Sequence, residues 1–239
     1  MSQATLSGKN YVVTGANSGI GLFSARRFAQ LGANVALVCR NEQRGREAVA
    51  QIIATTGNEN ISLYLADFSS LASVSLMADN LLRDIPKIDV LCNNAGGANG
   101  SRMVTKEGFE TTFVSNHLSC LLLTKKLLPA ILNAADEDLA RIVFTSSYGH
   151  FNSALDFNDL GLKEGYGTLK AYGRSKLMSL LTARELQNRL AGKSVVASSF
   201  HPGAVRTPIW KKGGLLARLL GLVLYPFMKS VAQGSATFI

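Results

Sequence analysis

Six short apolar segments, separated by longer helical stretches, constrain the fold of this chain most strongly. Their apolar residues form unbroken runs, a pattern typical of strands that are covered on both faces. The predicted strands are Tyr11–Gly15, Asn34–Cys39, Ile61–Ala66, Ile88–Asn93, Arg141–Ser146 and Ser194–Phe200. The predicted helices between them are Gly19–Leu31, Glu42–Thr56, Ser70–Asp84, Lys106–Ala135 and Thr168–Ala191.

This alternation predicts an α/β fold with one doubly wound parallel sheet and helices on both faces. A length of 239 residues fits one such domain, spanning positions 1–239. Apolar residues make up 47% of the chain and charged residues 17%, which excludes a chain that is disordered throughout. In such sheets ligands bind beyond the carboxyl ends of the strands, so we expect the functional residues there.

The turn after the first predicted strand carries three glycines, Gly15, Gly19 and Gly21. Glycine permits a tight turn and lets backbone N–H groups approach a diphosphate at the start of a helix. An ordinary strand-to-helix turn that happens to contain glycines is the alternative. The position in the first strand–helix unit favours dinucleotide binding.

The second predicted strand is followed by Arg40, where NAD-binding folds of this kind carry an acidic residue. A guanidinium is permanently charged and matches the oxygens of a 2′-phosphate, so this position favours NADP(H) over NAD(H). Arg44 lies one helical turn further and could assist. The alternative for Arg40 is an arginine that is merely solvated at the surface.

The third and fourth predicted strands are also followed by polar residues. Asp67 could accept a hydrogen bond from an adenine amino group, although a helix cap beside Ser69 and Ser70 is an equally ordinary role. The stretch Asn93–Gly96 follows the fourth strand. Taken alone, each of these two signals is weak.

Tyr172 and Lys176 are four residues apart in a predicted helix and therefore share one face of it. An ammonium group near a tyrosine favours its phenolate form, which makes the pair a credible proton donor to a carbonyl. Ser147 follows the fifth predicted strand, where its hydroxyl could hold a substrate oxygen. On chemistry alone, a solvent-facing Tyr/Lys pair is the more common situation.

Several of these residues form a series of motifs that covers almost the whole chain. They are Thr14–Gly21, Asn93–Gly96, Asn116, Ser146–Ser147, Tyr172–Lys176 and Pro202–Thr207. With these motifs in this order, the chain resembles the short-chain dehydrogenase/reductases, which have a Rossmann-type fold. The stretch Val38–Asn41 and the long insert between Ser147 and Tyr172 are similar to the retinol-dehydrogenase-like group.

The resemblance implies the roles of individual residues. Tyr172 would be the general acid or base, Lys176 would hold the nicotinamide ribose, Ser147 would polarise the carbonyl and Asn116 would help to hold a water. Ser146 and Ser147 are both candidates for the carbonyl, and the family alignment favours the second. The implied cofactor-binding residues are Gly15, Asn17, Ser18, Gly19, Ile20, Gly21, Arg40, Asn41, Asp67, Phe68, Asn94, Ala95, Gly96, Tyr172, Lys176, Pro202, Gly203, Val205 and Thr207.

The function implied is an NADP(H)-dependent oxidoreductase that transfers a hydride between the nicotinamide and an apolar carbonyl or alcohol, such as a retinoid, a steroid or a lipid aldehyde. A catalytically silent dinucleotide-binding sensor or scaffold is the alternative, and the intact set of four catalytic-type residues argues against it. We expect a homo-oligomer. Members of the family usually have one more strand beyond the position of Ile239, so we expect this sheet to lack its last strand.

The formal net charge of the chain is +9, and five of these charges lie between His201 and Ile239, where there is no acid. No nucleic-acid recognition motif accompanies them, so we expect no nucleic-acid partner. By resemblance, residues 208–230 would be a substrate lid, and the basic apolar segment 210–229 would allow contact with a membrane surface. His117, His150 and His201 have no metal-ligand spacing, so no metal is expected. Three cysteines without a CxxC pair favour a reducing, cytoplasmic location.

Overall fold

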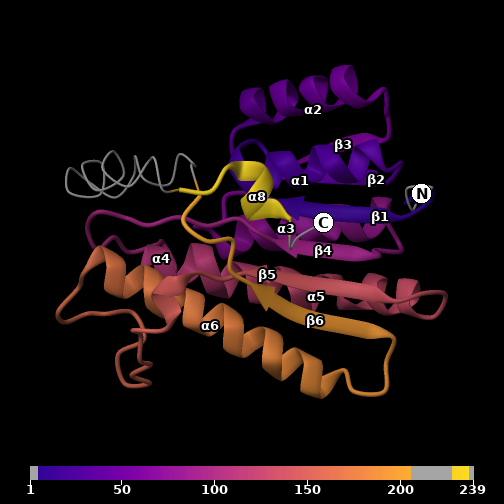
Figure 1. Ribbon diagram of the computed structural model, residues 1–239. Helices are drawn as coiled ribbons and strands as arrows, with labels where there is room; N and C mark the ends of the chain where they lie inside the picture. The colour runs from indigo at the N-terminus through magenta and orange to yellow at the C-terminus, as the bar shows by residue number, and fades with distance from the viewer. Residues whose placement is uncertain (1–4, 206–227, 237–239) are drawn as a thin grey trace.

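The computed structural model describes residues 5–205 and 228–236. Its centre is a parallel sheet with the strand order β3-β2-β1-β4-β5-β6 (Figure 1). The strands are β1 (Asn10–Thr14), β2 (Asn34–Cys39), β3 (Ile61–Leu65), β4 (Val90–Asn93), β5 (Ala140–Thr145) and β6 (Val195–Phe200). The order reverses between β1 and β4, and a cleft beyond the carboxyl ends of these strands is where such folds bind dinucleotides. The predicted α/β fold is therefore confirmed.

Helices cover both faces of this sheet. They are α1 (Gly19–Gln30), α2 (Glu42–Thr56), α3 (Leu71–Asp84), α4 (Thr111–Phe113), α5 (Ser119–Ala135), α6 (Thr168–Arg189) and α8 (Val231–Ser235). A π-helical turn, Val114–Leu118, joins α4 to α5, and a 3₁₀ turn, Tyr148–His150, follows β5. In Figure 1, α2 and α6 lie at opposite ends of the molecule, beside the edge strands β3 and β6.

Two apolar cores explain the unbroken apolar runs in the sequence. Alternate residues of each central strand point to opposite faces, as Val12 and Val13 of β1 do. Val12 packs with the core that α3, α5 and α6 cover, whereas Val13 packs with the core that α1 and α2 cover. Because both faces are buried, neither needs a polar residue.

The predicted helix start at Lys106 is wrong. The structure begins this helix at Thr111, because residues 104–110 form a tight turn closed by the antiparallel bridge between Val104 and Glu110. The buried Glu110 carboxylate then accepts hydrogen bonds from the N–H groups of Thr112 and Phe113, at 2.8 and 2.7 Å. A carboxylate that caps free N–H groups starts a helix at that point.

The continuous helix Thr111–Ala135 is long and apolar enough to cross a membrane by length and composition alone. Half of its most apolar window is buried inside the protein. Leu123, Leu127 and Ile131 are among its fully buried residues and belong to the core beneath α3. Packing on the sheet inside the protein therefore explains why this helix is so apolar.

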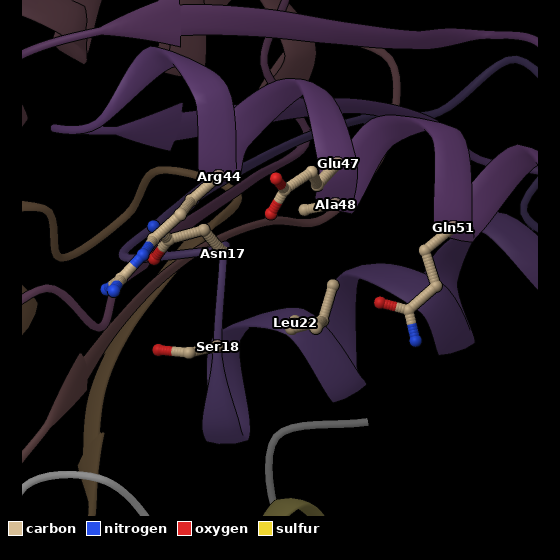
Figure 2. Close-up of a pocket in the computed structure, with 7 residues that line it drawn as sticks. All are labelled: Asn17, Ser18, Leu22, Arg44, Glu47, Ala48 and Gln51. Carbon is tan, nitrogen blue, oxygen red and sulfur yellow. The ribbon is translucent and has the colours of Figure 1, made fainter.

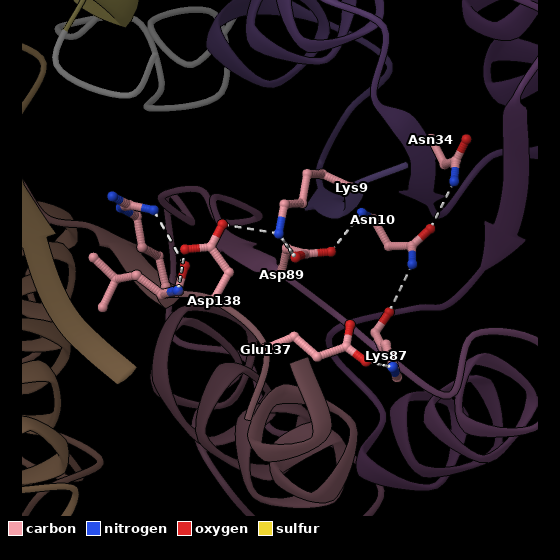
Figure 3. A network of polar contacts seen from close by, with 9 residues as sticks. Lys9, Asn10, Asn34, Lys87, Asp89, Glu137 and Asp138 are labelled. Carbon is pink, nitrogen blue, oxygen red and sulfur yellow. Dashed lines mark hydrogen bonds and ion pairs between the residues drawn. The ribbon is translucent and has the colours of Figure 1, made fainter. Parts of the chain in front are cut away.

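Polar contacts tie the amino ends of the strands together, far from the expected site (Figure 3). Lys9 forms ion pairs of 3.0 Å with both Asp89 and Asp138. The second Asp89 oxygen accepts from the backbone N–H of Asn10 at 2.8 Å, and the Asn10 side chain accepts from Asn34 at 2.9 Å. These contacts link the amino ends of β1, β2 and β4 and the turn before β5.

Candidate active site

The glycine-rich turn between β1 and α1 has no room for a side chain at Gly15 or Gly21. Gly15 and Gly19 have positive φ angles of 66° and 55°. A Cβ on Gly21 would lie 2.7 Å from the Asn94 amide nitrogen and still nearer to the Gly15 carbonyl oxygen. Within the described residues, the Ser18 side chain at the start of α1 makes no cap, so it does not occupy the first N–H groups of the helix. These features fit the diphosphate of a dinucleotide.

Thr14, the last residue of β1, joins this turn to the loop after β4. Its hydroxyl donates to the Cys92 carbonyl at 3.1 Å and accepts from the N–H groups of Asn94 and Ala95, both at 2.9 Å. The Asn94 side chain donates to the Thr14 carbonyl at 2.9 Å. No local pattern in the sequence indicates this role of Thr14, because its partners lie about 80 residues away.

Tyr172 and Lys176 lie on one face of α6, as their spacing predicts. The Lys176 ammonium is 5.6 Å from the centre of the Tyr172 ring and donates to the Thr145 carbonyl at 2.7 Å. Lys176 is 4% exposed, whereas Tyr172 is only partly buried and stays accessible to a substrate. A buried cation beside an accessible phenol is suited to proton transfer.

The two serines at the end of β5 differ in their surroundings. Ser146 is buried and its hydroxyl donates to the Lys176 carbonyl at 2.9 Å, so it ties β5 to α6. Ser147 is partly exposed and starts the 3₁₀ turn, and its hydroxyl accepts a long 3.4 Å contact from the Gly149 N–H as its one hydrogen bond within residues 5–205 and 228–236. The Ser147 hydroxyl is therefore the one that remains available to a substrate oxygen.

Asn116 lies in the π-helical turn, a deviation that frequently marks functional sites. Its side chain accepts from the Gly97 N–H at 2.9 Å and donates to the Gly97 carbonyl at 2.8 Å and to the Ser175 hydroxyl at 2.9 Å. These bonds leave its amide fully engaged and fix the loop after β4 against α6. A Cβ on Gly96 would lie 2.9 Å from the Asn116 oxygen and 3.5 Å from the Lys176 nitrogen, which places all three together.

The expected adenosine end of the site is a cavity of about 290 Å³ between the glycine-rich turn and α2. Figure 2 shows the Arg44 guanidinium beside the Asn17 side chain, with the Ser18 hydroxyl directed to the same side. The residues that line the cavity are Asn17, Ser18, Leu22, Arg44, Glu47, Ala48 and Gln51. Asn17, Ser18 and Arg44 offer two donors and one cation to an anionic group, whereas the Glu47 carboxylate in the same lining would repel it.

Arg40 follows β2 and is exposed, and it forms no ion pair with an acid in the described part of the chain. Asn41 caps α2 by accepting from the Arg44 N–H at 2.9 Å, so its side-chain oxygen has a structural partner. Asp67 accepts from the N–H and the hydroxyl of Ser69 at 2.9 and 2.8 Å through one oxygen. Ser70, not Asp67, caps α3. Phe68 is buried beside this turn.

The loop after β6 holds the residues expected near the nicotinamide. Gly203 has a φ of 86° and lies against the Lys229 side chain, whose Nζ would be 3.6 Å from a Cβ at this position. The Lys229 N–H donates to the Ala204 carbonyl at 2.8 Å, and Val205 is buried. Thr207 and most of the expected lid 208–230 lie outside the described residues.

Burial keeps three titratable side chains near the site in their neutral forms. Burial lowers the pKa of His117 to about 4, so this imidazole is neutral at physiological pH. Burial also raises the pKa of Cys120 to about 12 and that of Cys39 to about 11, which keeps both as inert thiols. Among the described residues no cluster of three His, Cys, Asp or Glu side chains could hold a metal ion.

Comparison with known proteins decides the family. The family described as short chain dehydrogenase matches residues 9–214. The chain belongs to the short-chain dehydrogenase family. Its curated relatives include retinol dehydrogenase 12 of Mus musculus, which is 40% identical over 96% of this chain and 72% of that protein. Retinol dehydrogenase 13 of Homo sapiens is 36% identical over 90% of this chain and 64% of that protein.

These relatives identify the chain as an oxidoreductase of the retinol-dehydrogenase-like group, and the chain spans roughly two thirds to three quarters of their length. A solved short-chain dehydrogenase of Sphingobium yanoikuyae in complex with NADPH is 25% identical. It superposes with a TM-score of 0.76 over 96% of this chain and 82% of that one. The predicted fold and family are thus both confirmed.

Sequence reasoning missed Arg102, Arg174 and Lys229. Arg174 lies within the Tyr172–Lys176 motif, and its burial at 9% exposure has no local signal in the sequence. Each of the three contacts an irregular loop rather than a regular element. An arginine inside a helix is ordinarily solvent-exposed, so no pattern singled it out.

Proposed function

We propose that this protein is an NADP(H)-dependent oxidoreductase that interconverts an apolar carbonyl compound and its alcohol. The observation that carries the proposal is the buried Lys176 ammonium beside the accessible Tyr172 ring, with the partly exposed Ser147 hydroxyl just beyond the end of the neighbouring strand. These groups suit the protonation of a carbonyl oxygen, which is the acid–base half of a carbonyl reduction.

The residues around the glycine-rich turn fit a dinucleotide. The turn excludes side chains at Gly15 and Gly21, the start of α1 offers free N–H groups, and Arg40 and Arg44 provide positive charge near α2. The guanidinium of Arg40, where an acid would favour NAD(H), supports a preference for NADP(H). When bound, the reduced cofactor supplies the hydride that adds to the carbonyl carbon.

The chain's own residues perform the rest of the reaction. The Tyr172 hydroxyl donates its proton to the carbonyl oxygen as the carbon becomes an alcohol, while the Ser147 hydroxyl holds that oxygen by a hydrogen bond. Lys176 holds its ammonium close to the ring and stabilises the phenolate that remains. Asn116 keeps the loop after β4 in place against Lys176. In the reverse direction Tyr172 accepts the proton of the alcohol.

The substrate class rests on the family position of segment 208–230 and on the names of the relatives. The two curated relatives compared above are both named retinol dehydrogenases, and an apolar lid suits an apolar substrate. The same segment, with its basic residues, supports contact with an anionic membrane surface and a cytoplasmic location at that surface. A homo-oligomer is part of the proposal.

A substrate panel tests this proposal. Purified protein is mixed with retinoid, steroid, lipid and small aromatic aldehydes, ketones and alcohols, with NADPH or NADH or the oxidised cofactors. We expect turnover with at least one apolar carbonyl and a higher kcat/KM with NADPH than with NADH. Tight NADPH binding without turnover of any compound would instead favour a catalytically silent dinucleotide sensor.

A further inference from the structure

The 3₁₀ turn Tyr148–His150 follows directly on Ser147, the residue proposed to hold the substrate oxygen. Ser147 has an extended backbone, with φ at −158° and ψ at 157°. Its hydroxyl accepts a 3.4 Å contact from the Gly149 N–H, which is longer than an ordinary hydrogen bond of about 2.7–3.2 Å. The direction of this hydroxyl therefore depends mainly on how the backbone of the turn is held.

His150 holds this backbone through two hydrogen bonds to one atom, the Ser147 carbonyl oxygen. The His150 backbone N–H donates to it at 3.1 Å, which closes the 3₁₀ turn, and the ring Nδ1 lies 2.6 Å from it. A carbonyl oxygen can only accept, so Nδ1 is the ring nitrogen that carries a hydrogen. The ring bond is the shorter of the two, and it ties a side chain to the backbone of Ser147.

Two glycines bring the same turn against α6 beside Tyr172. A Cβ on Gly149 would lie 3.3 Å from the Gly173 Cα and 3.7 Å from the Tyr172 ring, and a Cβ on Gly173 would lie 2.6 Å from the Gly149 carbonyl oxygen. The Ser153 hydroxyl donates to that carbonyl at 2.7 Å. The turn thus packs directly on the helix residue that follows Tyr172, so a shift of the turn would move Ser147 relative to the proposed proton donor.

A second histidine near the turn uses its ring in the opposite way. His201, in the loop after β6, lies with its ring centre 3.9 Å from that of Tyr148, and its Nδ1 accepts from the Gly203 N–H at 3.0 Å. Burial is the largest of the effects that lower the pKa of His201, so this ring is neutral at physiological pH and carries its hydrogen on Nε2. The two rings therefore differ in an observable property, the nitrogen that bears the hydrogen.

We propose that His150 is a positioning residue, which holds the Ser147 carbonyl through its ring N–H and thereby aims the Ser147 hydroxyl at the substrate oxygen. The inference rests on the proposed function, in which Ser147 polarises that oxygen. His150 acts through Ser147 and has no other part in the reaction. Loss of the ring bond should therefore slow the reduction and leave NADPH binding unchanged. It should cost little more once the Ser147 hydroxyl has been removed.

The first experiment tests the ring bond in the wild-type protein, independently of activity. The nitrogens of the three histidines are isotope-labelled, and the protein is examined by NMR at about pH 8, where an ordinary imidazole is neutral, with and without NADPH. The His150 signals are identified by their loss in His150→Asn. We expect the Nδ1–H form at His150 and the Nε2–H form at His201. The Nε2–H form at His150 would overturn the proposal.

The second experiment tests whether the bond acts through Ser147. His150→Leu removes the donor, whereas His150→Asn keeps one, because the asparagine amide nitrogen can take the place of Nδ1. Both changes are made in the wild type and in Ser147→Ala. Phe157→Leu, at an exposed aromatic residue of the same insert, is the control. The rate of aldehyde reduction by NADPH-saturated protein is measured in single turnover, together with the NADPH Kd and the midpoint of thermal unfolding.

We expect His150→Leu to slow the reduction roughly 10–100-fold, because a displacement of about 1 Å at a reacting group can cost about a hundredfold. His150→Asn should return most of the way to the wild-type rate, and the NADPH Kd should stay within about twofold in every variant. In Ser147→Ala, His150→Leu should change the rate by less than about twofold, since two groups that act as one unit are not additive.

A wild-type rate in His150→Leu would overturn the proposal. An equal loss in both backgrounds would also overturn it, because His150 would then act on the substrate or on the fold and not through Ser147. A lower rate in His150→Asn that matches His150→Leu would exclude the ring bond as the cause. A wild-type protein that reduces no compound of the panel contradicts the proposed function instead. The role through Ser147 then falls with it, while the NMR result still decides whether the ring bond exists.

Discussion

The ammonium of Lys176 lies 5.6 Å from the centre of the Tyr172 ring while it donates a 2.7 Å hydrogen bond to the carbonyl of Thr145, the last residue of β5. This bond ties Lys176 of α6 to the end of β5, one residue before Ser146 and two residues before Ser147. The cation beside the proposed proton donor is therefore bonded to the strand that carries the proposed carbonyl-binding serine.

Lys176→Met should lower both NADPH affinity and kcat, because the lysine is proposed to hold the nicotinamide ribose and to stabilise the Tyr172 phenolate. Loss of a hydrogen bond from a charged group costs about 1.5–3 kcal/mol, which corresponds to roughly a 10–150-fold weaker Kd. Fluorescence titration with NADPH measures this change in Kd. Lys170→Met, an exposed lysine of the same helix, is the control. An unchanged NADPH Kd in Lys176→Met would contradict the ribose role.

The two serines after β5 should respond differently to alanine. Ser147→Ala should lower kcat by about 10²–10³-fold, the usual effect of removing one donor to a developing oxyanion, with little change in stability. Ser146→Ala removes the buried bond to the Lys176 carbonyl and should cost about 1 kcal/mol of unfolding free energy with most activity retained. Steady-state kinetics and urea unfolding separate the two. The reverse pattern would assign the carbonyl to Ser146.

Cofactor choice should depend on Arg40. A charge-assisted pair with a 2′-phosphate corresponds to about a 10–150-fold preference for NADPH. Arg40→Asp would repel the phosphate and offer an acceptor to a 2′-hydroxyl, so the preference should move toward NADH. The measurement is kcat/KM for both cofactors at fixed low ionic strength. A variant that keeps its NADPH preference would show that Arg44 and Asn17, beside the cavity in Figure 2, hold the phosphate.

Gly21→Ala should destabilise the protein by about 1–3 kcal/mol, because the new Cβ has no space beside the Asn94 amide and the Gly15 carbonyl. The displaced turn should also weaken NADPH binding. Thermal unfolding and NADPH titration measure the two effects. Gly100→Ala, in the loop after β4, is the matched control because a Cβ there meets nothing within 4 Å. Equal stability and equal NADPH affinity of the two variants would mean that the glycine-rich turn can shift to accommodate a Cβ at position 21.

Local signals in the sequence predicted much of the fold. The bounds of α2 match the predicted Glu42–Thr56, because Asn41 caps its start and Gly57 ends it with a φ of 70°. The start of α4 at Thr111 could not be predicted in the same way. This start depends on the antiparallel bridge between Val104 and Glu110. The bridge is a feature of the folded turn, and no residue pattern in the sequence indicates it.

The candidate site likewise combines features that local sequence predicts with contacts between distant parts of the chain. The spacing of Tyr172 and Lys176 is a local property of a helix, and the sequence places them together correctly. The contact of Ser146 with the Lys176 carbonyl joins two elements 30 residues apart, and the contact of Arg174 with Asp159 reaches an irregular loop. Periodicity carries no information about such contacts. The sequence therefore indicated the proposed reacting groups and missed the long-range contacts that hold their elements together.

The most direct test of the proposed chemistry is the turnover number of Tyr172→Phe with NADPH and an apolar aldehyde that the wild type reduces, measured together with the NADPH Kd. Phenylalanine keeps the ring beside Lys176 and removes only the hydroxyl. The proposal predicts a kcat at least about 10²–10⁴-fold lower, the usual contribution of general acid–base catalysis, with the NADPH Kd within about twofold of wild type. A kcat close to wild type would contradict it, since another group would then supply the proton.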